Sequence, residues 1–330
     1  MTQRRPRASG DAGGAVAPDP TDCACTGVRW CGRCLDPARR RARGLDEPLP
    51  LPAALGPRVR PFEDAEDPLA RAPWPAGVHR FDPDRQCAPD CPGFRGLRLY
   101  RDVVSEVEAA RILRTIEATP FQPAQSGKRK QHFGPRINFS KRRIQLGGFS
   151  GIPDYAREIE ARVRARVEAD AQLDSAEAFA CLAAFRDFST TDVFVLRYLE
   201  AERSNLDFHA DDDFGYGEVI LDLSLEADGV LTFGRIPDGP GRATDGESSP
   251  RARAGIAAAR DLARHAEACF VRVPLPARSV AVLHGDARWH WQHAVLARDV
   301  VGRRTSVTLR TLSPALRDTE IGREVLDRTR

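Results

Sequence analysis

The chain has 330 residues, of which 42% are hydrophobic, enough for one sizeable packed core with extensions. Its formal net charge of +3 is too small for electrostatic steering by the whole molecule, so a charged partner would have to meet local basic clusters. Because no apolar run approaches the roughly 18 residues that span a bilayer, and the N-terminus lacks the apolar stretch of a secretory signal, we expect no membrane association and an intracellular protein of the cytoplasm and nucleus.

Three segments of different composition precede residue 96. Residues 1–22 are rich in small and basic residues and are predicted to be disordered, and residues 35–95 form a Pro- and Arg-rich linker. Between them, residues 23–34 carry a CxC-x5-CxxC pattern, and clustered cysteines in a reducing compartment indicate a metal rather than disulfides. Four thiolates in so short a segment predict a structural zinc site, with unmetallated thiols as the alternative. The zinc ligands would be Cys23, Cys25, Cys31 and Cys34.

Four more cysteines lie outside this pattern. Cys87 and Cys91 form a looser pair in a Pro-rich context, and the sequence shows no evident partner pair that would complete a second metal site. Cys181 and Cys269 are predicted to be buried as small hydrophobic residues.

Two helices are predicted near the start of a folded domain that we place at residues 96–315. Ser105 and Glu108 form the pattern of a capping box, and apolar residues then recur at helical spacing until Pro120. A second helix is predicted from about Pro153, because apolar residues then recur every four positions. They are Tyr155, Ile159, Val163 and Val167.

After Thr191 the hydrophobic pattern changes to that of β-strands. Six short segments alternate apolar and polar residues or are continuously apolar, at 193–199, 219–224, 230–233, 270–273, 279–283 and 304–312. Many short strands after two helices favour an α+β fold. The predicted architecture is a double-stranded β-helix (jelly roll) with flanking N-terminal helices, a disordered, Cys-rich N-terminal extension and a C-terminal tail at 316–330.

One carboxylate and two imidazoles carry the chemistry that the sequence indicates. His209 and Asp211 are two positions apart near a strand end, where both side chains would point the same way, and His293 follows in a second strand-like segment. Such a set can occupy one face of an Fe(II) octahedron and leave positions open for a keto acid and O₂. Alone the pattern is weak, because a surface HxD and a packed histidine would look the same.

Two arginines downstream strengthen the interpretation. Arg304 and Arg310 are six residues apart on one predicted strand and therefore share a face. Guanidinium groups suit carboxylates, and a dicarboxylate co-substrate needs such anchors; surface salt bridges are the alternative. The hydroxyl of Tyr198 could assist them, although a core tyrosine is an equally simple explanation.

The order of these residues resembles the AlkB family of Fe(II)/2-oxoglutarate dioxygenases, and within it most of all the branch of the fourth AlkB homologue of animals. The resemblance is carried by QSGKRKQHFGPRINF at 125–139, GFSGIP at 148–153, PLPARS at 274–279 and the cysteine pattern at 23–34. It implies iron ligation by His209, Asp211 and His293, and 2-oxoglutarate binding by Arg304, Arg310 and Tyr198. It also implies that the enzyme uses O₂ to hydroxylate an N-methyl group, which leaves as formaldehyde while 2-oxoglutarate becomes succinate and CO₂.

The resemblance implies monomethyl-lysine in an actin-like protein as the substrate, with N6-methyladenine or another methylated base in DNA or RNA as the alternative. The substrate would be met by basic residues interleaved with aromatics, and by an acidic residue after the iron ligands. The candidates are Lys128, Arg129, Lys130, Phe133 and Asp213. A third hypothesis, from another class, is a zinc-dependent interaction protein with an inactive dioxygenase fold.

Overall fold

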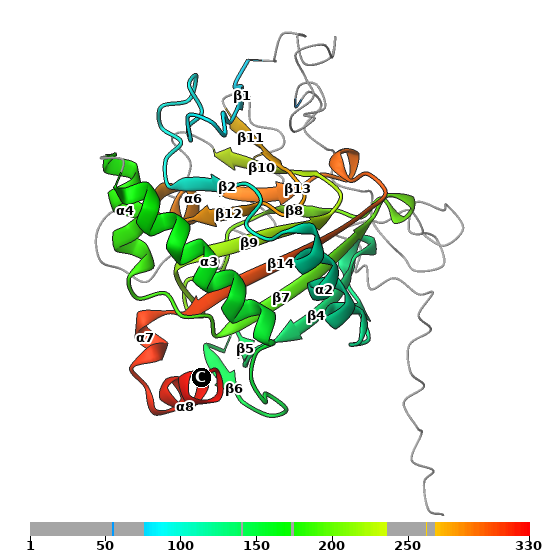
Figure 1. Cartoon of the computed structure of the whole chain (residues 1–330), viewed down its shortest axis with the longest axis vertical. Helices are drawn as coiled ribbons and strands as arrows, with labels where there is room; N and C mark the ends of the chain where they lie inside the picture. The colour runs from blue at the N-terminus through cyan, green and yellow to red at the C-terminus, as the bar shows by residue number, and fades with distance from the viewer. Residues whose placement is uncertain (1–54, 56–75, 140, 173–174, 236–261, 263–267) are drawn as a thin grey trace, which may run out of the picture.

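The computed structural model describes residues 55, 76–139, 141–172, 175–235, 262 and 268–330. The expectations for residues 1–22, for the cysteine pattern at 23–34 and for most of the linker therefore lie outside the described residues. Within them, two β-sheets face each other, and helices cover the outer face of the larger sheet (Figure 1). The expected α+β class, with several antiparallel sheets, is confirmed.

The two predicted helices are α2 (Glu106–Glu117) and α3 (Asp154–Ala171). The capping box is present, since the Ser105 hydroxyl accepts from the Glu108 backbone and the Glu108 carboxylate accepts from the Ser105 backbone. The apolar residues that recur every four positions in α3 are all buried. The further helical elements are α4 (Ala176–Phe185), α6 (Gly285–Trp289), α7 (Pro314–Arg317), α8 (Glu320–Arg328) and the 3-10 turns η1 (Gln125–Gly127), η2 (Glu200–Glu202) and η3 (Ala297–Asp299).

Among the described residues, all strand pairs between named strands are antiparallel except one. The larger sheet has the order β2 (Leu97–Tyr100), β12 (Val280–Leu283), β9 (Tyr216–Glu226), β14 (Arg303–Leu312), β7 (Asp192–Leu199), β4 (Arg129–Phe133) and β3 (Gln122–Pro123). The smaller sheet has the order β1 (Val78–Arg80), β11 (Cys269–Leu275), β10 (Gly229–Arg235), β13 (Gln292–Val295) and β8 (Leu206–His209). A separate hairpin joins β5 (Arg136–Asn138) to β6 (Arg143–Gln145), and the single parallel pair is β1 with β11.

The central strand β14 shows why a site forms between the sheets. Its side chains alternate, and Val307 and Leu309 point into the apolar layer under the helices. The intervening Ser306, Thr308 and Arg310 point toward the smaller sheet and line a cavity there. A strand whose inner face is this polar buries groups that need partners, which is typical of a binding site rather than of a core.

The structure describes regular elements on both sides of the residues expected to form the folded domain. The linker was predicted to reach residue 95, but β1 joins the smaller sheet, and Phe81 and Phe94 are buried in the core between the sheets. Most of the segment predicted as a C-terminal tail forms α8, whose Val325 is buried in the same apolar cluster as the buried residues of α3. Short apolar stretches such as these gain their structure only from a distant partner.

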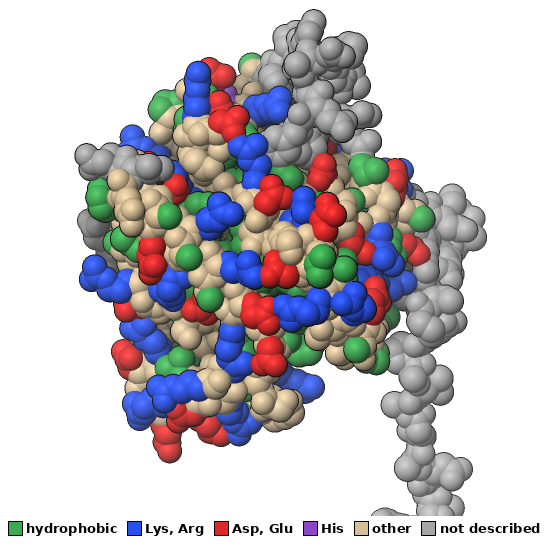
Figure 2. Space-filling view, in the orientation of Figure 1, with side chains coloured by type: hydrophobic (Ala, Val, Ile, Leu, Met, Phe, Trp, Pro, Cys, Tyr) green, Lys and Arg blue, Asp and Glu red, His purple; other side chains and the backbone are tan. Residues whose placement is uncertain are grey.

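The helix-covered face has the mixed charge of an ordinary solvated surface. Lys, Arg, Asp and Glu side chains are interspersed over it, without a broad region of one sign (Figure 2). In the part of the chain that the structure describes, no helix is both long and apolar enough to cross a bilayer.

Candidate active site

His209, Asp211 and His293 meet at one end of the smaller sheet. His209 is the last residue of β8 and lies directly opposite His293 of β13, while Asp211 follows beyond the strand end. One ligand atom from each residue lies within 4.8 Å of the other two. The three side chains expected to share one ion therefore do come together, although backbone beyond the strand end, and not a shared strand face, positions Asp211.

The protonation states suit a metal ligand set. Nδ1 of His209 lies 2.9 Å from the carbonyl oxygen of Asp207, which can only accept, so Nδ1 carries the proton and Nε2 is the ligand atom. Burial, together with the nearby His209, lowers the pKa of His293 to about 3, so its imidazole is neutral at physiological pH. Oδ2 of Asp211 accepts no hydrogen bond from the described residues and lies 3.5 Å from Nε2 of His293. Two imidazoles and a carboxylate oxygen without a donor fit Fe(II), with further positions open.

A cavity of about 120 Å³ extends from these three residues between the sheets. Its apolar walls come from both sheets. They are formed by Phe194, Leu196, Leu206, Ile220, Leu231, Leu283 and Val295. Its polar groups, apart from the three candidate ligands, are Tyr198, Asp222, Ser306, Thr308 and Arg310.

Arg304 lies beside this cavity and has an unused donor. Its Nε donates to Oγ of Ser224 at 2.9 Å, and its Nη2 lies 3.4 Å from Oδ2 of Asp222. Nη1 is buried and has no hydrogen-bond partner among the described residues. The Arg304 guanidinium also lies 5.4 Å from the centre of the Tyr198 ring. A buried guanidinium with an unsatisfied N–H fits the distal carboxylate of 2-oxoglutarate.

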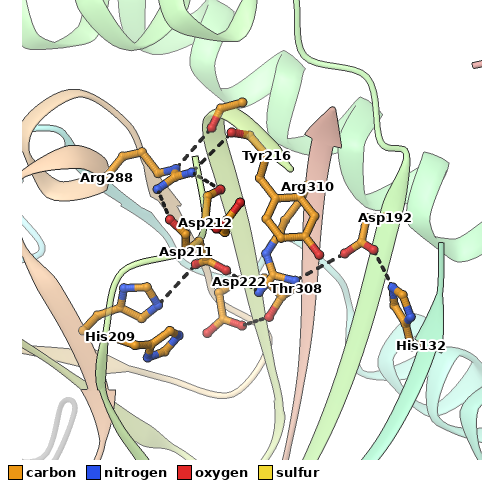
Figure 3. A network of polar contacts seen from close by, with 12 residues as sticks. His132, Asp192, His209, Asp211, Asp212, Tyr216, Asp222, Arg288, Thr308 and Arg310 are labelled. Carbon is orange, nitrogen blue, oxygen red and sulfur yellow. Dashed lines mark hydrogen bonds and ion pairs between the residues drawn. The ribbon is translucent and has the colours of Figure 1, made fainter. Parts of the chain in front are cut away.

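Arg310 belongs to a chain of charged groups that leads away from the candidate metal ligands. Its Nη2 lies 2.7 Å from Oδ1 of Asp211, and its Nη1 lies 3.3 Å from Oδ1 of Asp192. The other oxygen of Asp192 is 2.5 Å from Nε2 of His132 on β4 (Figure 3). Arg304 and Arg310 share a strand face as predicted, but in this structure Arg310 is engaged by a ligand carboxylate.

Arg288, in α6, supports the backbone that carries the ligand Asp211, and the sequence analysis did not identify it. The side chain is 2% exposed and donates to the carbonyl oxygens of Asp211 and Asp212 at 2.9 and 3.2 Å (Figure 3). It also donates to those of Tyr216 and Gly217, at 3.4 and 3.1 Å. One guanidinium thus holds both ends of the 211–217 loop. Its only sequence signal was its place five residues before His293.

The candidate substrate residues separate onto different faces. Lys128 is buried, and its ammonium donates to the carbonyl oxygen of Asn205. Phe133 packs against the core under the helices. Lys130 lies opposite Leu196, which lines the cavity, so it is on the cavity side of the sheet.

Arg129 and Asp213 complete that set. Arg129 lies opposite Arg197, whose guanidinium reaches Glu117 of α2, so Arg129 is on the helix side of the sheet. Asp213 is half-buried in the turn after the ligand Asp211, where its neighbour Asp212 accepts from the backbone N–H groups that follow.

Comparison with known proteins agrees with the site. Residues 96–310 match the family model described as the 2OG-Fe(II) oxygenase superfamily. The chain is 31% identical over 312 residues to the human alpha-ketoglutarate-dependent dioxygenase alkB homolog 4, covering 92% of each chain. It is 26% identical over 215 residues to a Caenorhabditis elegans DNA N6-methyl adenine demethylase, covering 65% of this chain and 59% of the relative.

Solved structures of low sequence identity are also similar. The structure of OsALKBH1 is 15% identical, with a TM-score of 0.43, and covers 66% of this chain and 97% of its own. A prolyl-4-hydroxylase from Pseudomonas putida is 15% identical, with a TM-score of 0.38, and covers 67% of this chain and 94% of its own.

Proposed function

Because the chain belongs to the 2OG-Fe(II) oxygenase superfamily, as a dioxygenase of the AlkB family, we propose that it catalyses oxidative N-demethylation of monomethyl-lysine in an intracellular, actin-like protein. The observation that carries the proposal is the His209, Asp211 and His293 cluster, which lines one cavity beside the Arg304 N–H group that has no partner among the described residues. We also infer that the two facing sheets form a double-stranded β-helix.

The protein's own contribution is binding, orientation and exclusion of water. Bound Fe(II), with 2-oxoglutarate and O₂, supplies the oxidising power that hydroxylates the N-methyl group, which then leaves as formaldehyde. His209, Asp211 and His293 would hold the metal. Arg304 would bind the distal carboxylate, and Tyr198, whose pKa burial raises above its ordinary value, would remain a neutral hydroxyl beside it.

The placement of the candidate substrate residues supports a cationic side chain as substrate. Two members of the basic and aromatic set that would suit a nucleic-acid strand, Lys128 and Phe133, are withdrawn from the surface or packed against the helices. Asp213, in contrast, stands half-buried two residues after the ligand Asp211. A carboxylate there would pair with a methylammonium group as it approaches the metal.

A methylated base is the second candidate substrate. One relative is described as a DNA N6-methyl adenine demethylase. Lys130, on the cavity side of β4, and the exposed Phe139 would then meet the phosphate backbone and a base.

A coupled turnover assay separates these functions. The protein, with Fe(II) and 2-oxoglutarate, is given either a monomethyl-lysine peptide or an N6-methyladenine oligonucleotide, and succinate and formaldehyde are quantified. We expect stoichiometric succinate and formaldehyde with the peptide, and no stimulated succinate in Asp211→Ala. Stimulation by the oligonucleotide alone supports the second candidate. No stimulation by either, in protein shown to bind Fe(II), supports an inactive fold.

A matched variant tests the role of Asp213. Asp213→Asn should lower kcat/KM for the methyl-lysine peptide roughly tenfold, the equivalent of about 1.4 kcal/mol. Its affinity for 2-oxoglutarate should not change, because Asp213 does not line the cavity. An unchanged kcat/KM for the peptide would remove Asp213 from the substrate site.

A further inference from the structure

A second group of metal-binding side chains lies away from the candidate iron ligands. It consists of His79 on β1, Cys91 in the segment after β1, and Cys269 at the start of β11. One ligand atom from each lies within 4.8 Å of the other two, and the sulfur atoms of the two cysteines are 3.5 Å apart. The sequence analysis predicted Cys269 to be buried as a small hydrophobic residue, but it is half-buried. Its sulfur lies beside that of Cys91, for which the sequence alone showed no further metal-binding partner.

The sheet register explains why these three residues meet. In the parallel pair, His79 lies opposite Val271, and Cys269 is two residues before Val271 on the same strand. Since residues two apart on a strand share a face, His79 and Cys269 project from the same side of the sheet. The chain then turns back through the Asp82–Cys87 bridge and brings Cys91 over that side.

The geometry suits a tetrahedral ion better than a disulfide. A disulfide needs sulfur atoms about 2.05 Å apart. Two thiolates that bind one zinc ion at about 2.3 Å with tetrahedral angles are separated by roughly 3.7 Å, close to the distance observed. Two sulfurs and one imidazole are also donors that bind zinc in preference to magnesium or calcium, which prefer oxygen ligands.

The surroundings of Cys91 favour the thiolate form that a metal requires. The hydrogen bond with Cys269 lowers the pKa of Cys91 to about 7, against the effect of burial. Arg235 of β10 lies opposite Cys269 in the sheet, and its positive charge also favours thiolates in this pair. Cys91 therefore loses its proton to a metal more readily than an ordinary thiol, whereas the shared hydrogen bond and burial raise the pKa of Cys269, which loses its proton only as the metal binds.

We propose that His79, Cys91 and Cys269 bind a zinc ion that links β1 and the segment after it to β11, with a solvent water as the fourth ligand. His79 and Cys269 are half-buried, so this cluster is not fully enclosed by protein. The role is structural, since the ion would connect residues 178 positions apart and tie the N-terminal edge of the smaller sheet. This site is separate from the dioxygenase chemistry and does not depend on the proposed function.

The experiment measures zinc in the full chain. To remove the contribution of the N-terminal cysteines, Cys23, Cys25, Cys31 and Cys34 are replaced by Ser in the parent and in every variant. Zinc per chain is then determined by elemental analysis for the parent, Cys91→Ser, Cys269→Ser and the control Cys87→Ser, whose thiol lies in the same segment but outside the cluster. The iron ligands are unchanged throughout, so differences report only on this site.

We expect the parent and Cys87→Ser to hold one more zinc ion per chain than Cys91→Ser or Cys269→Ser. His79→Cys, at a half-buried position that should tolerate the change, should retain the ion and, with Co(II) in its place, show stronger thiolate-to-cobalt absorption than the parent. Equal zinc in the parent and both cysteine variants would overturn the proposal. So would a parent without zinc in which Cys91 and Cys269 resist alkylation until reduced, because the pair would then be a disulfide. If a cysteine variant does not fold, an unchanged cobalt spectrum in His79→Cys would overturn the proposal by itself.

Discussion

Nη2 of Arg310 lies 2.7 Å from Oδ1 of Asp211, so the arginine expected to bind 2-oxoglutarate contacts a candidate iron ligand. Burial opposes the ionisation of Asp211, but Arg310 and its other neighbours outweigh that effect and keep the pKa of Asp211 below its ordinary value. With Oδ1 fixed by Arg310, Oδ2 is the oxygen left for the metal. Arg310 therefore positions the carboxylate.

Replacing Arg310 should weaken iron binding. Arg310→Met removes a positive charge near the metal site, and this removal by itself would strengthen the binding of a cation. The gain should be small, because the carboxylate of Asp192 already balances much of the charge of Arg310. Loss of the fixed Asp211 orientation should dominate, and the affinity for Fe(II) should fall roughly tenfold or more. Anaerobic Fe(II) titration without 2-oxoglutarate measures this, with Arg303→Met on the same strand as the control. Tighter binding in Arg310→Met would contradict the positioning role.

Arg288 should matter for both stability and iron binding. Arg288→Lys leaves most of four backbone carbonyl oxygens without their donor, and we expect a loss of about 2 kcal/mol or more in the free energy of unfolding. Calorimetry gives the stability, and Fe(II) titration below the melting temperature gives the affinity. The exposed Arg298→Lys serves as the control. A variant as stable as the parent would show that the 211–217 loop keeps its conformation without the hydrogen bonds from Arg288.

Asp222 should make 2-oxoglutarate binding depend on pH. Burial raises the pKa of this carboxylate, which accepts from Oγ1 of Thr308 at 3.1 Å and faces Arg304. A co-substrate carboxylate at Arg304 would raise that pKa further, so binding takes up a proton and weakens as the pH rises through the pKa of Asp222.

Asp222→Asn removes this titration while keeping a side chain that can bond to Thr308. At pH values above the pKa of Asp222, we expect Asp222→Asn to bind 2-oxoglutarate more tightly than the parent does. The affinity of the variant for 2-oxoglutarate should also vary less with pH. Isothermal titration in buffers of different ionisation enthalpy would measure both the affinity and the proton uptake. The same pH profile in parent and variant would remove Asp222 from the co-substrate site.

Gly229 offers a test of the Arg304 position that leaves the arginine itself unchanged. A Cβ atom at Gly229 would lie 2.6 Å from Nε of Arg304, so Gly229→Ala must displace the guanidinium. Since a hydrogen bond to a charged group contributes about 1.5–3 kcal/mol, KM for 2-oxoglutarate should rise roughly ten- to a hundred-fold. Gly93→Ala, where no atom lies within 4 Å of the added Cβ, is the matched control. An unchanged KM would place the co-substrate elsewhere.

Local patterns determined a good part of the fold and the site in advance. The Ser105 and Glu108 capping box and the four-residue repeat of α3 follow from helix geometry within a few residues. The order of His209, Asp211 and His293 likewise indicated a metal site, and the three residues do meet.

Only the tertiary structure decided what depends on contact between distant segments. Strand pairing put Phe133 on the helix side of the sheet and Lys130 on the cavity side. The basic and aromatic composition of this segment does not predict which side chain faces which way. The same pairing brought Cys269 to Cys91 and β1 into the smaller sheet. The sequence sets the periodicity of each strand, but the register between strands sets which side chains meet, because a shift of one residue turns every side chain to the opposite face.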